Sequence, residues 1–389
     1  MTAMNKKKFV ICIVAAFLAG SAVTGGACAA IFNGALGYVK VSKSDYREMS
    51  QTYERYAKLE TLYEAINENF YSDVDDYALV DAACKGLVSG LDDPYSAYMT
   101  ADEYKSWKAS ATGEYSGVGI TFGADDDGNF TVISVEKDSP AEKAGIKAGD
   151  ILLKADDKEY DDLELLANAI RGTAGSKVKL TYSRNGKENE VTMTRQTITQ
   201  HSVEYKMIDD ATGYISISSF IDSTGDDFED ALSTIEGKGA ENLVLDLRDN
   251  GGGLVDEAVD VADQFLDEGV VVYVEDKEKN RSDYDAEDGK TDLNTVVLIN
   301  ENSASASEIL AAALKDNGFK LVGEKSYGKG VIQSTSELSD GSALKLTIMQ
   351  YFSPNGNKIH KKGVKPDYEV QNDENSDTDA QLEKALSLF

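Results

Sequence analysis

The C-terminal half of the chain contains the stretch Ser303-Ala304-Ser305-Ala306-Ser307-Glu308-Ile309-Leu310, followed by Tyr327-Gly328-Lys329-Gly330-Val331-Ile332-Gln333. The first stretch predicts a turn that enters a helix near Ser305, whose N-terminal amides and dipole would face developing negative charge. The second predicts a lysine on a glycine-flanked loop that continues into a strand. A serine and a lysine so placed are a candidate nucleophile and base. Because the chain has only two histidines, His201 and His360, we favour Ser/Lys chemistry.

Lys329 can act as a base only when its amine is neutral. At the usual pKa of about 10.4, neutralising a lysine at pH 7 costs about 4.6 kcal/mol. Burial disfavours the charged form and reduces this cost. Gln333, four residues further on, could hold the amine through its side-chain carbonyl without adding a charge. The alternative is a Ser/Ala-rich helix start with a surface lysine on a hairpin, and spacing alone does not separate the two.

Two other motifs overlap this lysine. Gly323 to Lys329 fits the first seven positions of a phosphate-binding loop, but the eighth position is Gly330, where a Ser or Thr should bind magnesium. The residues after Gly330 favour a strand rather than the helix whose N-terminus would hold phosphate. Ser326 and Lys329 also form an S-x-x-K pattern, and the glycines argue against the helix that it needs. We therefore expect no nucleotide, no metal and no other cofactor.

A third segment points to acyl transfer. Asn242 to Arg248 predicts a buried strand, Asp249 to Gly253 a glycine-rich turn, and Leu254 to Leu266 an amphipathic helix. A triple glycine between strand and helix leaves backbone N–H groups free to bind an oxyanion, although most such turns are only turns. Beside the turn, Arg248 and Asp249 are interpreted as a structural ion pair.

Taken together, these segments resemble the C-terminal processing peptidases, also called tail-specific proteases. The likeness extends from about Tyr53 to Leu388. It implies that Ser305 is the nucleophile, Lys329 the base and Gln333 the residue that orients the lysine. It also implies an oxyanion hole of backbone amides at Gly252 and Ala306. The further segments that carry the likeness are Leu91 to Tyr98, Leu247 to Gly253, Tyr351 to Gly356 and Gly363 to Asp367.

The spacing departs from the family in one respect. Ser305 and Lys329 are 24 positions apart, one fewer than the family leads us to expect. A shortened turn near Asn317-Gly318 accounts for the difference, and Ser303 and Ser307 stay as alternative nucleophiles. Ser307 is the one that most resembles a simple helix cap.

Residues 113–197 resemble a PDZ domain, through Ser116 to Phe122 and Ser139 to Leu152. The resemblance implies that a loop of Gly117, Val118, Gly119 and Ile120 receives a terminal carboxylate. The strand after this loop could then pair with an extended peptide by β-augmentation. The helical pattern from Asp162 to Arg171 would form the opposite wall. An ordinary β-hairpin with a buried helix is the structural alternative.

The ends and the composition of the chain bear on its location and partners. The net charge is −30, so nucleic acid is not an expected partner. Lys6 to Lys8 precede an uncharged stretch, Phe9 to Phe32, that is long enough to span a bilayer and would place the rest outside the cytoplasm. A cleaved signal peptide with a site at Ala27-Cys28-Ala29 is the alternative, which would make the protein secreted. Apolar residues between Tyr53 and Ile66 have helical spacing and could pack on the core or on a second copy of the chain.

The predicted fold class is α+β and multidomain, with an N-terminal helical region, an inserted β-rich PDZ domain and an α/β catalytic core like that of crotonases and Clp proteases. The predicted function is an extracytoplasmic serine endopeptidase that recognises the C-terminal tails of protein substrates and cleaves through an acyl-enzyme. The alternative function is an inactive PDZ scaffold that binds peptides. The predicted regions are the signal anchor 1–32, the helical region 45–112, the PDZ domain 113–197, the peptidase core 198–370 and the acidic tail 371–389.

Overall fold

The computed structural model describes residues 41–389 except 126–127, 288, 290, 374–375 and 377. The predicted membrane anchor or signal peptide therefore lies outside the described residues. Within the described part, no helix combines the length and the apolar character needed to cross a bilayer. The chain divides into two compact units, Met1–Ala83 and Cys84–Phe389.

The first unit contains the first of the predicted N-terminal helices and the start of the second. Helix α2 (Lys43–Asn69) begins at Ser42, whose hydroxyl accepts from the Asp45 amide at 3.1 Å, and α3 (Asp76–Ser89) continues across the boundary into the second unit. No residue of α2 is buried. Tyr53, Leu59 and Leu62 are 68%, 51% and 51% exposed, so the described chain leaves this apolar face uncovered.

A five-stranded antiparallel sheet, in the order β3-β4-β5-β6-β7, forms the inserted module. β3 is at its edge, and the short strands β2 and β8 pair with each other just outside it, which brings the entry and the exit of the module together. Because its entry and its exit lie side by side, the module can be inserted into the sequence of the core without disrupting the packing of the core. The elements are β2 (Glu114–Gly117), β3 (Ile120–Ala124), β4 (Phe130–Val135), α5 (Pro140–Lys143), β5 (Ile151–Ala155), α6 (Leu163–Ile170), β6 (Lys177–Arg184), β7 (Lys187–Thr194) and β8 (Gln196–Thr199).

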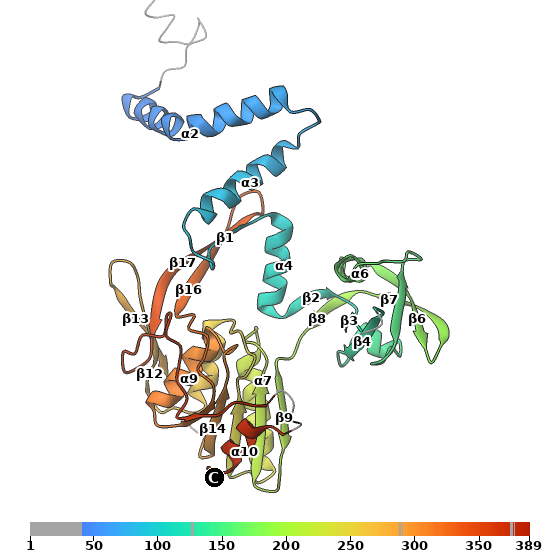
Figure 1. The fold of residues 1–389 in the computed structure, drawn as a ribbon, viewed down its shortest axis with the longest axis vertical. Coiled ribbons are helices and arrows are strands. Elements are labelled where there is room, and N and C mark those ends of the chain that lie inside the picture. Colours follow the sequence, from blue (N-terminus) through green and yellow to red (C-terminus); the bar gives the residue numbers. More distant parts are fainter. Residues whose placement is uncertain (1–40, 126–127, 288, 290, 374–375, 377) are drawn as a thin grey trace, which may run out of the picture. The chain divides into compact units, whose positions relative to one another are not determined.

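The core is built on a six-stranded sheet in the order β18-β15-β14-β11-β10-β9. Figure 1 labels two of these strands, β14 and β9. All neighbouring pairs are parallel except β9 with β10. Successive side chains of a strand point to opposite faces. Leu243 and Leu245 accordingly join the large cluster with α7, α8 and α9, while Val244 joins a smaller cluster under α10. The elements are β9 (Val203–Met207), β10 (Thr212–Ile217), α7 (Thr224–Gly237), β11 (Asn242–Asp246), α8 (Val255–Asp263), β14 (Asn294–Ile299), α9 (Ala306–Asp316), β15 (Lys320–Gly323), β18 (Tyr368–Glu369) and α10 (Ala380–Leu386).

A second sheet, in the order β1-β17-β12-β13 with β16 also paired to β17, carries the lysine segment. β1 (Ala97–Met99) precedes the inserted module in sequence and pairs antiparallel with β17, Ala97 lying opposite Lys345. Residues from both sides of the insertion therefore form one sheet. The remaining elements are α4 (Ala101–Thr112), β12 (Gly269–Glu275), β13 (Arg281–Ala286), β16 (Val331–Glu337) and β17 (Ala343–Phe352).

The predicted site residues follow the carboxyl ends of three parallel strands. The glycine turn follows β11, the serine stretch follows β14, and the loop of Lys329 follows β15. These strands are neighbours in the sheet, in the order β15-β14-β11. In open α/β sheets the crevice at the carboxyl ends of the strands is the usual place of a site. The fold thus gathers segments that are up to 80 residues apart.

Candidate active site

Ser305 is the residue from which α9 begins. It has φ +57° and ψ −115°, an unusual backbone conformation for a residue with a side chain. Such strained positions persist only where the surrounding structure holds them, and they are frequent at active sites. The N–H of Ala306, the first residue of α9, has no hydrogen-bond acceptor among the described residues, so it is free to bind another group.

The two neighbouring serines have structural partners. Ser303 is fully buried, and its hydroxyl donates to the Leu247 carbonyl at 2.7 Å. Ser307 is also fully buried and donates to the Asn250 carbonyl at 2.9 Å. Both bonds join the start of α9 to the loop after β11. Ser305, between them, is only half-buried, which leaves it the most accessible of the three.

Gly252 packs directly against the nucleophile candidate. A Cβ atom there would lie 2.6 Å from the Ser305 Cβ and 2.9 Å from the Ala306 nitrogen, and φ is +100°, so the position requires glycine. The Gly252 N–H donates to the Asn250 Oδ1 at 2.8 Å. This amide, unlike that of Ala306, already has a partner, which an oxyanion would have to share or replace.

Lys329 lies on the loop between β15 and β16. Its Nζ is 5.1 Å from the centroid of the Tyr95 ring, within the range of a cation–π contact. Burial lowers the pKa of Lys329, and the nearby positive charge of Lys345 lowers it further, while Asp93 and Glu308 act in the opposite direction. The net direction is the one that a general base needs at neutral pH.

Glu308 joins the serine segment to the lysine segment. Its carboxylate is fully buried and accepts four hydrogen bonds. One oxygen accepts from the amides of Ser305 at 3.0 Å and Lys329 at 2.8 Å. The other accepts from the Gly328 amide at 2.7 Å and from the Ser326 hydroxyl at 2.5 Å. Although burial raises the pKa of Glu308, the three backbone partners can only donate, which fits the ionised form.

Tyr351 makes a second link between the same two residues. It is fully buried, and its hydroxyl donates to the Ser305 carbonyl at 3.0 Å and lies against the Lys329 carbonyl. Burial raises the pKa of Tyr351 well above its usual value, so the hydroxyl keeps its proton. Ser305 and Lys329, predicted separately from two motifs, are therefore brought together by two buried side chains.

Gln333 lies on β16, the strand that follows the loop of Lys329. Its Nε2 donates to the Val331 carbonyl at 3.4 Å and to the Thr347 Oγ1 at 3.2 Å. Within the described part of the chain these are its side-chain hydrogen bonds, and the Lys329 amine is not among the partners.

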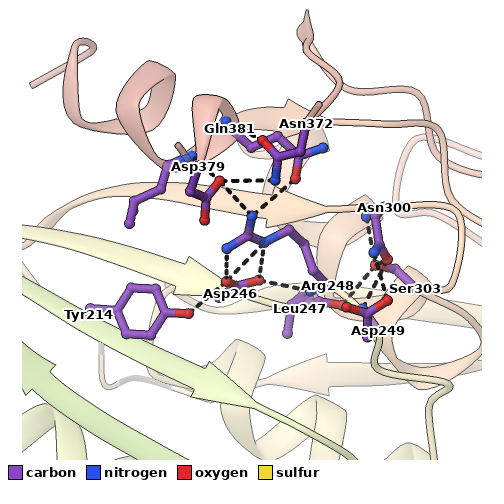
Figure 2. A network of polar contacts seen from close by, with 11 residues as sticks. Tyr214, Asp246, Leu247, Arg248, Asp249, Asn300, Ser303, Asn372, Asp379 and Gln381 are labelled. Carbon is purple, nitrogen blue, oxygen red and sulfur yellow. Dashed lines mark hydrogen bonds and ion pairs between the residues drawn. The ribbon is translucent and has the colours of Figure 1, made fainter. Parts of the chain in front are cut away.

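The predicted ion pair of Arg248 and Asp249 is wrong. Arg248 pairs with Asp246 at 2.6 Å, and it also pairs with Asp379 at 2.9 Å. Figure 2 shows the guanidinium between these two carboxylates. The prediction paired Arg248 with Asp249, its neighbour in sequence. The Arg248 side chain instead contacts Asp246, the last residue of β11, and Asp379, which caps the start of α10.

Asp249 has other partners. It has φ +59°, and its carboxylate accepts from the side-chain amides of Asn300 and Asn302, both at 2.8 Å. In return, the Asp249 amide donates to the Asn300 side chain at 2.9 Å (Figure 2). These bonds fasten the glycine turn to the loop that leads to Ser305.

The predicted carboxylate-binding loop lies between β2 and β3. Gly117 ends β2, and Ile120 begins β3. The carbonyls of Val118 and Gly119 accept backbone hydrogen bonds at 2.9 and 3.0 Å, whereas their N–H groups have no acceptor among the described residues. Gly119 has φ +78°, and a Cβ there would lie 2.3 Å from the Ser139 Cβ, so this loop also requires glycine.

Residue-by-residue reasoning did not single out Glu308 or Tyr351 as site residues. The signal for Glu308 was present, because an acidic residue three positions after a helix-capping serine is a capping box. No local sequence pattern indicates that Glu308 also accepts hydrogen bonds from residues 326 to 329. Tyr351 lies in a β-strand pattern that predicts burial, and nothing local indicates which carbonyls its hydroxyl contacts.

Comparisons with known proteins agree with this architecture. Residues 211–370 match the model of peptidase family S41, residues 116–194 that of a PDZ domain, and residues 28–103 that of the N-terminal domain of the activating protease CtpB. The chain is also similar to a structure of an S41 protease from Bacteroides fragilis, with 18% identity and a TM-score of 0.54 over 84% of this chain and 96% of that one. That similarity concerns the fold.

Curated relatives are more similar in sequence. The carboxy-terminal processing protease CtpA of Bacillus subtilis is 39% identical over 82% of this chain and 69% of its own length. A CtpA-like serine protease of Staphylococcus haemolyticus is 39% identical over 80% of this chain and 64% of its own length. The chain thus spans about two thirds of the length of these relatives. The predicted family and fold class are confirmed: the chain belongs to the C-terminal processing peptidases of the serine-type peptidase family S41, and it carries a PDZ domain.

Proposed function

We propose that the protein is a serine endopeptidase that cleaves the C-terminal tails of other proteins, with Ser305 as nucleophile and Lys329 as base. The observation that carries the proposal is the pair of buried links, Glu308 and Tyr351, that hold Ser305 and Lys329 beside each other. The half-buried setting of Ser305 and the lowered pKa of Lys329 support the two roles.

The reaction begins when the neutral Lys329 amine takes the hydroxyl proton of Ser305. The Ser305 oxygen bonds to the scissile carbonyl carbon, and the negative charge moves to the carbonyl oxygen, which the Ala306 N–H and the N-terminus of α9 stabilise. The protonated lysine then gives its proton to the leaving amine as the peptide C–N bond breaks. A water molecule, deprotonated by Lys329, attacks the acyl-enzyme, and the proton returns to Ser305 as the new carboxyl terminus leaves.

The PDZ domain supplies tail recognition in this proposal. β3 has a free edge in the described sheet, and an extended peptide could add to it as a further strand. The unpaired amides of Val118 and Gly119 are suitable donors for the terminal carboxylate of that peptide. Protein tails with exposed C-termini are therefore the proposed substrates.

The proposed location is outside the cytoplasm, with the chain held to the membrane by residues 1–32. This rests on the uncharged stretch after Lys6 to Lys8. Release of a signal peptide would instead give a secreted enzyme. Fractionation of cells that express the full chain, with protease added outside, distinguishes the two: anchored protein stays with the membrane and is digested from outside.

The proposal is tested with purified protein and an unstructured peptide tail, with products identified by mass spectrometry. The wild-type protein should cleave the peptide, and Ser305→Ala and Lys329→Ala should not. Ser303→Ala is the matched control, and its folded fraction should keep activity. Cleavage by Ser305→Ala at the wild-type rate would contradict the proposal, and binding without cleavage by the wild-type protein would favour the PDZ scaffold.

A further inference from the structure

The strand that carries Gln333 is irregular at that residue. In the β16–β17 pair, Ile332 lies opposite Met349 and Gln333 lies opposite Thr347, so Ile348 is an extra residue on β17. A bulge of this kind re-aims side chains and is common beside active sites. Here it makes Gln333 and Thr347 direct cross-strand neighbours, with a hydrogen bond between their side chains.

The hydrogen bonds of Gln333 determine which way its amide points. A backbone carbonyl can only accept, so the amide atom 3.4 Å from the Val331 oxygen must be the nitrogen. The same nitrogen donates to the Thr347 hydroxyl. The amide oxygen therefore points away from both groups and has no hydrogen-bond donor in the described chain. An oxygen so placed is available to accept from an amine.

Thr347 is in turn held from its other side by residues that precede the PDZ domain. Its backbone N–H donates to the Ser96 hydroxyl at 3.0 Å, and that hydroxyl donates to the Asp93 carboxylate at 2.6 Å. Although burial raises the pKa of Asp93, hydrogen bonds to its carboxylate, among them that of the Ser96 hydroxyl, lower it overall. The Thr347 Oγ1 accepts from the Gln333 Nε2 at 3.2 Å.

The same short segment reaches the lysine. Tyr95, between Asp93 and Ser96, places its ring 5.1 Å from the Lys329 Nζ. The adjoining strand β1 pairs with β17 from Ala97 to Met99, which fixes the position of the segment. Residues 93–96 thus contact both Lys329 and Thr347, the hydrogen-bond partner of Gln333.

We propose that Asp93 and Thr347 are positioning residues that hold the Gln333 amide with its oxygen free for the Lys329 amine. This inference rests on the proposed function, since it assigns no separate activity. Contacts run from Asp93 through the Ser96 hydroxyl to the backbone N–H of Thr347, and from the Thr347 hydroxyl to the nitrogen of Gln333. The oxygen of Gln333 would then accept from the Lys329 amine.

The test is a double-mutant cycle with Thr347→Val and Gln333→Ala, measured as kcat and KM for cleavage of a peptide tail. Valine keeps the shape of threonine and removes the hydroxyl, so kcat should fall about 5- to 30-fold with KM unchanged. Thr347→Ser, which keeps the hydroxyl, should stay within about twofold of wild type. In the Gln333→Ala background, Thr347→Val should change kcat by less than about twofold, because the group that it orients is gone.

An equal loss from Thr347→Val in both backgrounds, or no loss in either, would overturn the inference. Thermal unfolding of each variant distinguishes a loss of folded protein from a misplaced Gln333 side chain. Asp93→Asn is a second variant, and it too should lower kcat only when Gln333 is present. Ser305→Ala is measured in parallel. If it cleaves, the proposed function fails; if it is inactive while Thr347→Val keeps full activity, only the positioning role fails.

Discussion

The serine side of the candidate site and its lysine side are held in different ways. Ser305 lies between two fully buried serines whose hydroxyls bond to carbonyls of the loop after β11. The Lys329 amine lies against the ring of Tyr95, in a segment that precedes the PDZ domain. The interior of the core therefore fixes the candidate nucleophile, whereas the position of the candidate base depends also on a segment outside that interior.

The largest expected effect comes from removing the base. Lys329→Met keeps an unbranched side chain that tolerates burial but cannot take a proton. We expect kcat to fall about 10²- to 10⁴-fold, the usual contribution of a positioned general base. Lys325→Met, at an exposed lysine of the same loop, is the control and should leave kcat unchanged. A Lys329→Met enzyme within tenfold of wild type would show that the lysine side does not supply the base.

The serine side is tested by adding a methyl group at Gly252. Gly252→Ala places a Cβ 2.6 Å from the Ala304 carbonyl oxygen and from the Ser305 Cβ, so the loop must move away from the nucleophile. We expect kcat to fall about 10²- to 10³-fold, as when an oxyanion donor is lost.

Gly251→Ala is the matched control for Gly252→Ala, because a Cβ at Gly251 meets no atom within 4 Å. It should change neither kcat nor the thermal unfolding temperature. Equal activity of the two variants would mean that the packing of Gly252 against Ser305 has no part in catalysis.

Glu308 accepts hydrogen bonds from both the Ser305 and the Lys329 segments, so its replacement should disturb the serine side and the lysine side of the site. Glu308→Gln keeps one acceptor oxygen and turns an NH₂ group towards two donors. We expect the free energy of unfolding to fall by about 2 to 3 kcal/mol, because buried donors lose a charged partner, and kcat to fall in the fraction that remains folded.

Denaturant unfolding and peptide cleavage, both with the exposed Glu301→Gln as control, measure these two effects. A loss of stability without any loss of kcat in the folded fraction would show that the Glu308 carboxylate does not position Ser305 and Lys329 for catalysis.

The smallest expected effect concerns the charge of Lys345, which lowers the pKa of Lys329 by repelling its protonated form. Because the base acts when deprotonated, kcat/KM should fall as the pH drops through the pKa of Lys329. Lys345→Met removes the repulsion, raises that pKa and moves the fall to higher pH. The loss at neutral pH should be at most about fivefold, the size expected for a partly exposed charge pair.

A pH profile of kcat/KM for Lys345→Met and for Lys345→Arg, which keeps the charge, checks this shift. Added salt should reduce the difference between the two variants. A shift to lower pH in Lys345→Met would contradict the assignment of the titrating group to Lys329.

Much of the architecture could be predicted from local patterns. The strand Asn242–Asp246 lies within the predicted range 242–248, and the predicted helix after Ser305 and strand after Gly330 are observed as α9 and β16. Side chains of a helix or strand point in directions that repeat with the period of the element. When one face is buried, apolar residues therefore recur in the sequence at that period. The resemblance to the peptidase family then indicated the PDZ domain and the candidate residues.

Contacts between distant segments could not be predicted from the sequence. Arg248 was assigned to its neighbour in sequence, but it pairs across 131 residues with Asp379, and Thr347 bonds to Ser96 across 251 residues. The buried partners of Ser303 and Ser307, which leave Ser305 accessible, are of the same kind. Such contacts follow from the order of strands in a sheet and from an irregular register. Neither of these leaves a periodic pattern in the sequence. The sequence therefore predicted three candidate serines at 303, 305 and 307, and only the packing of the core shows that Ser305 is the accessible one.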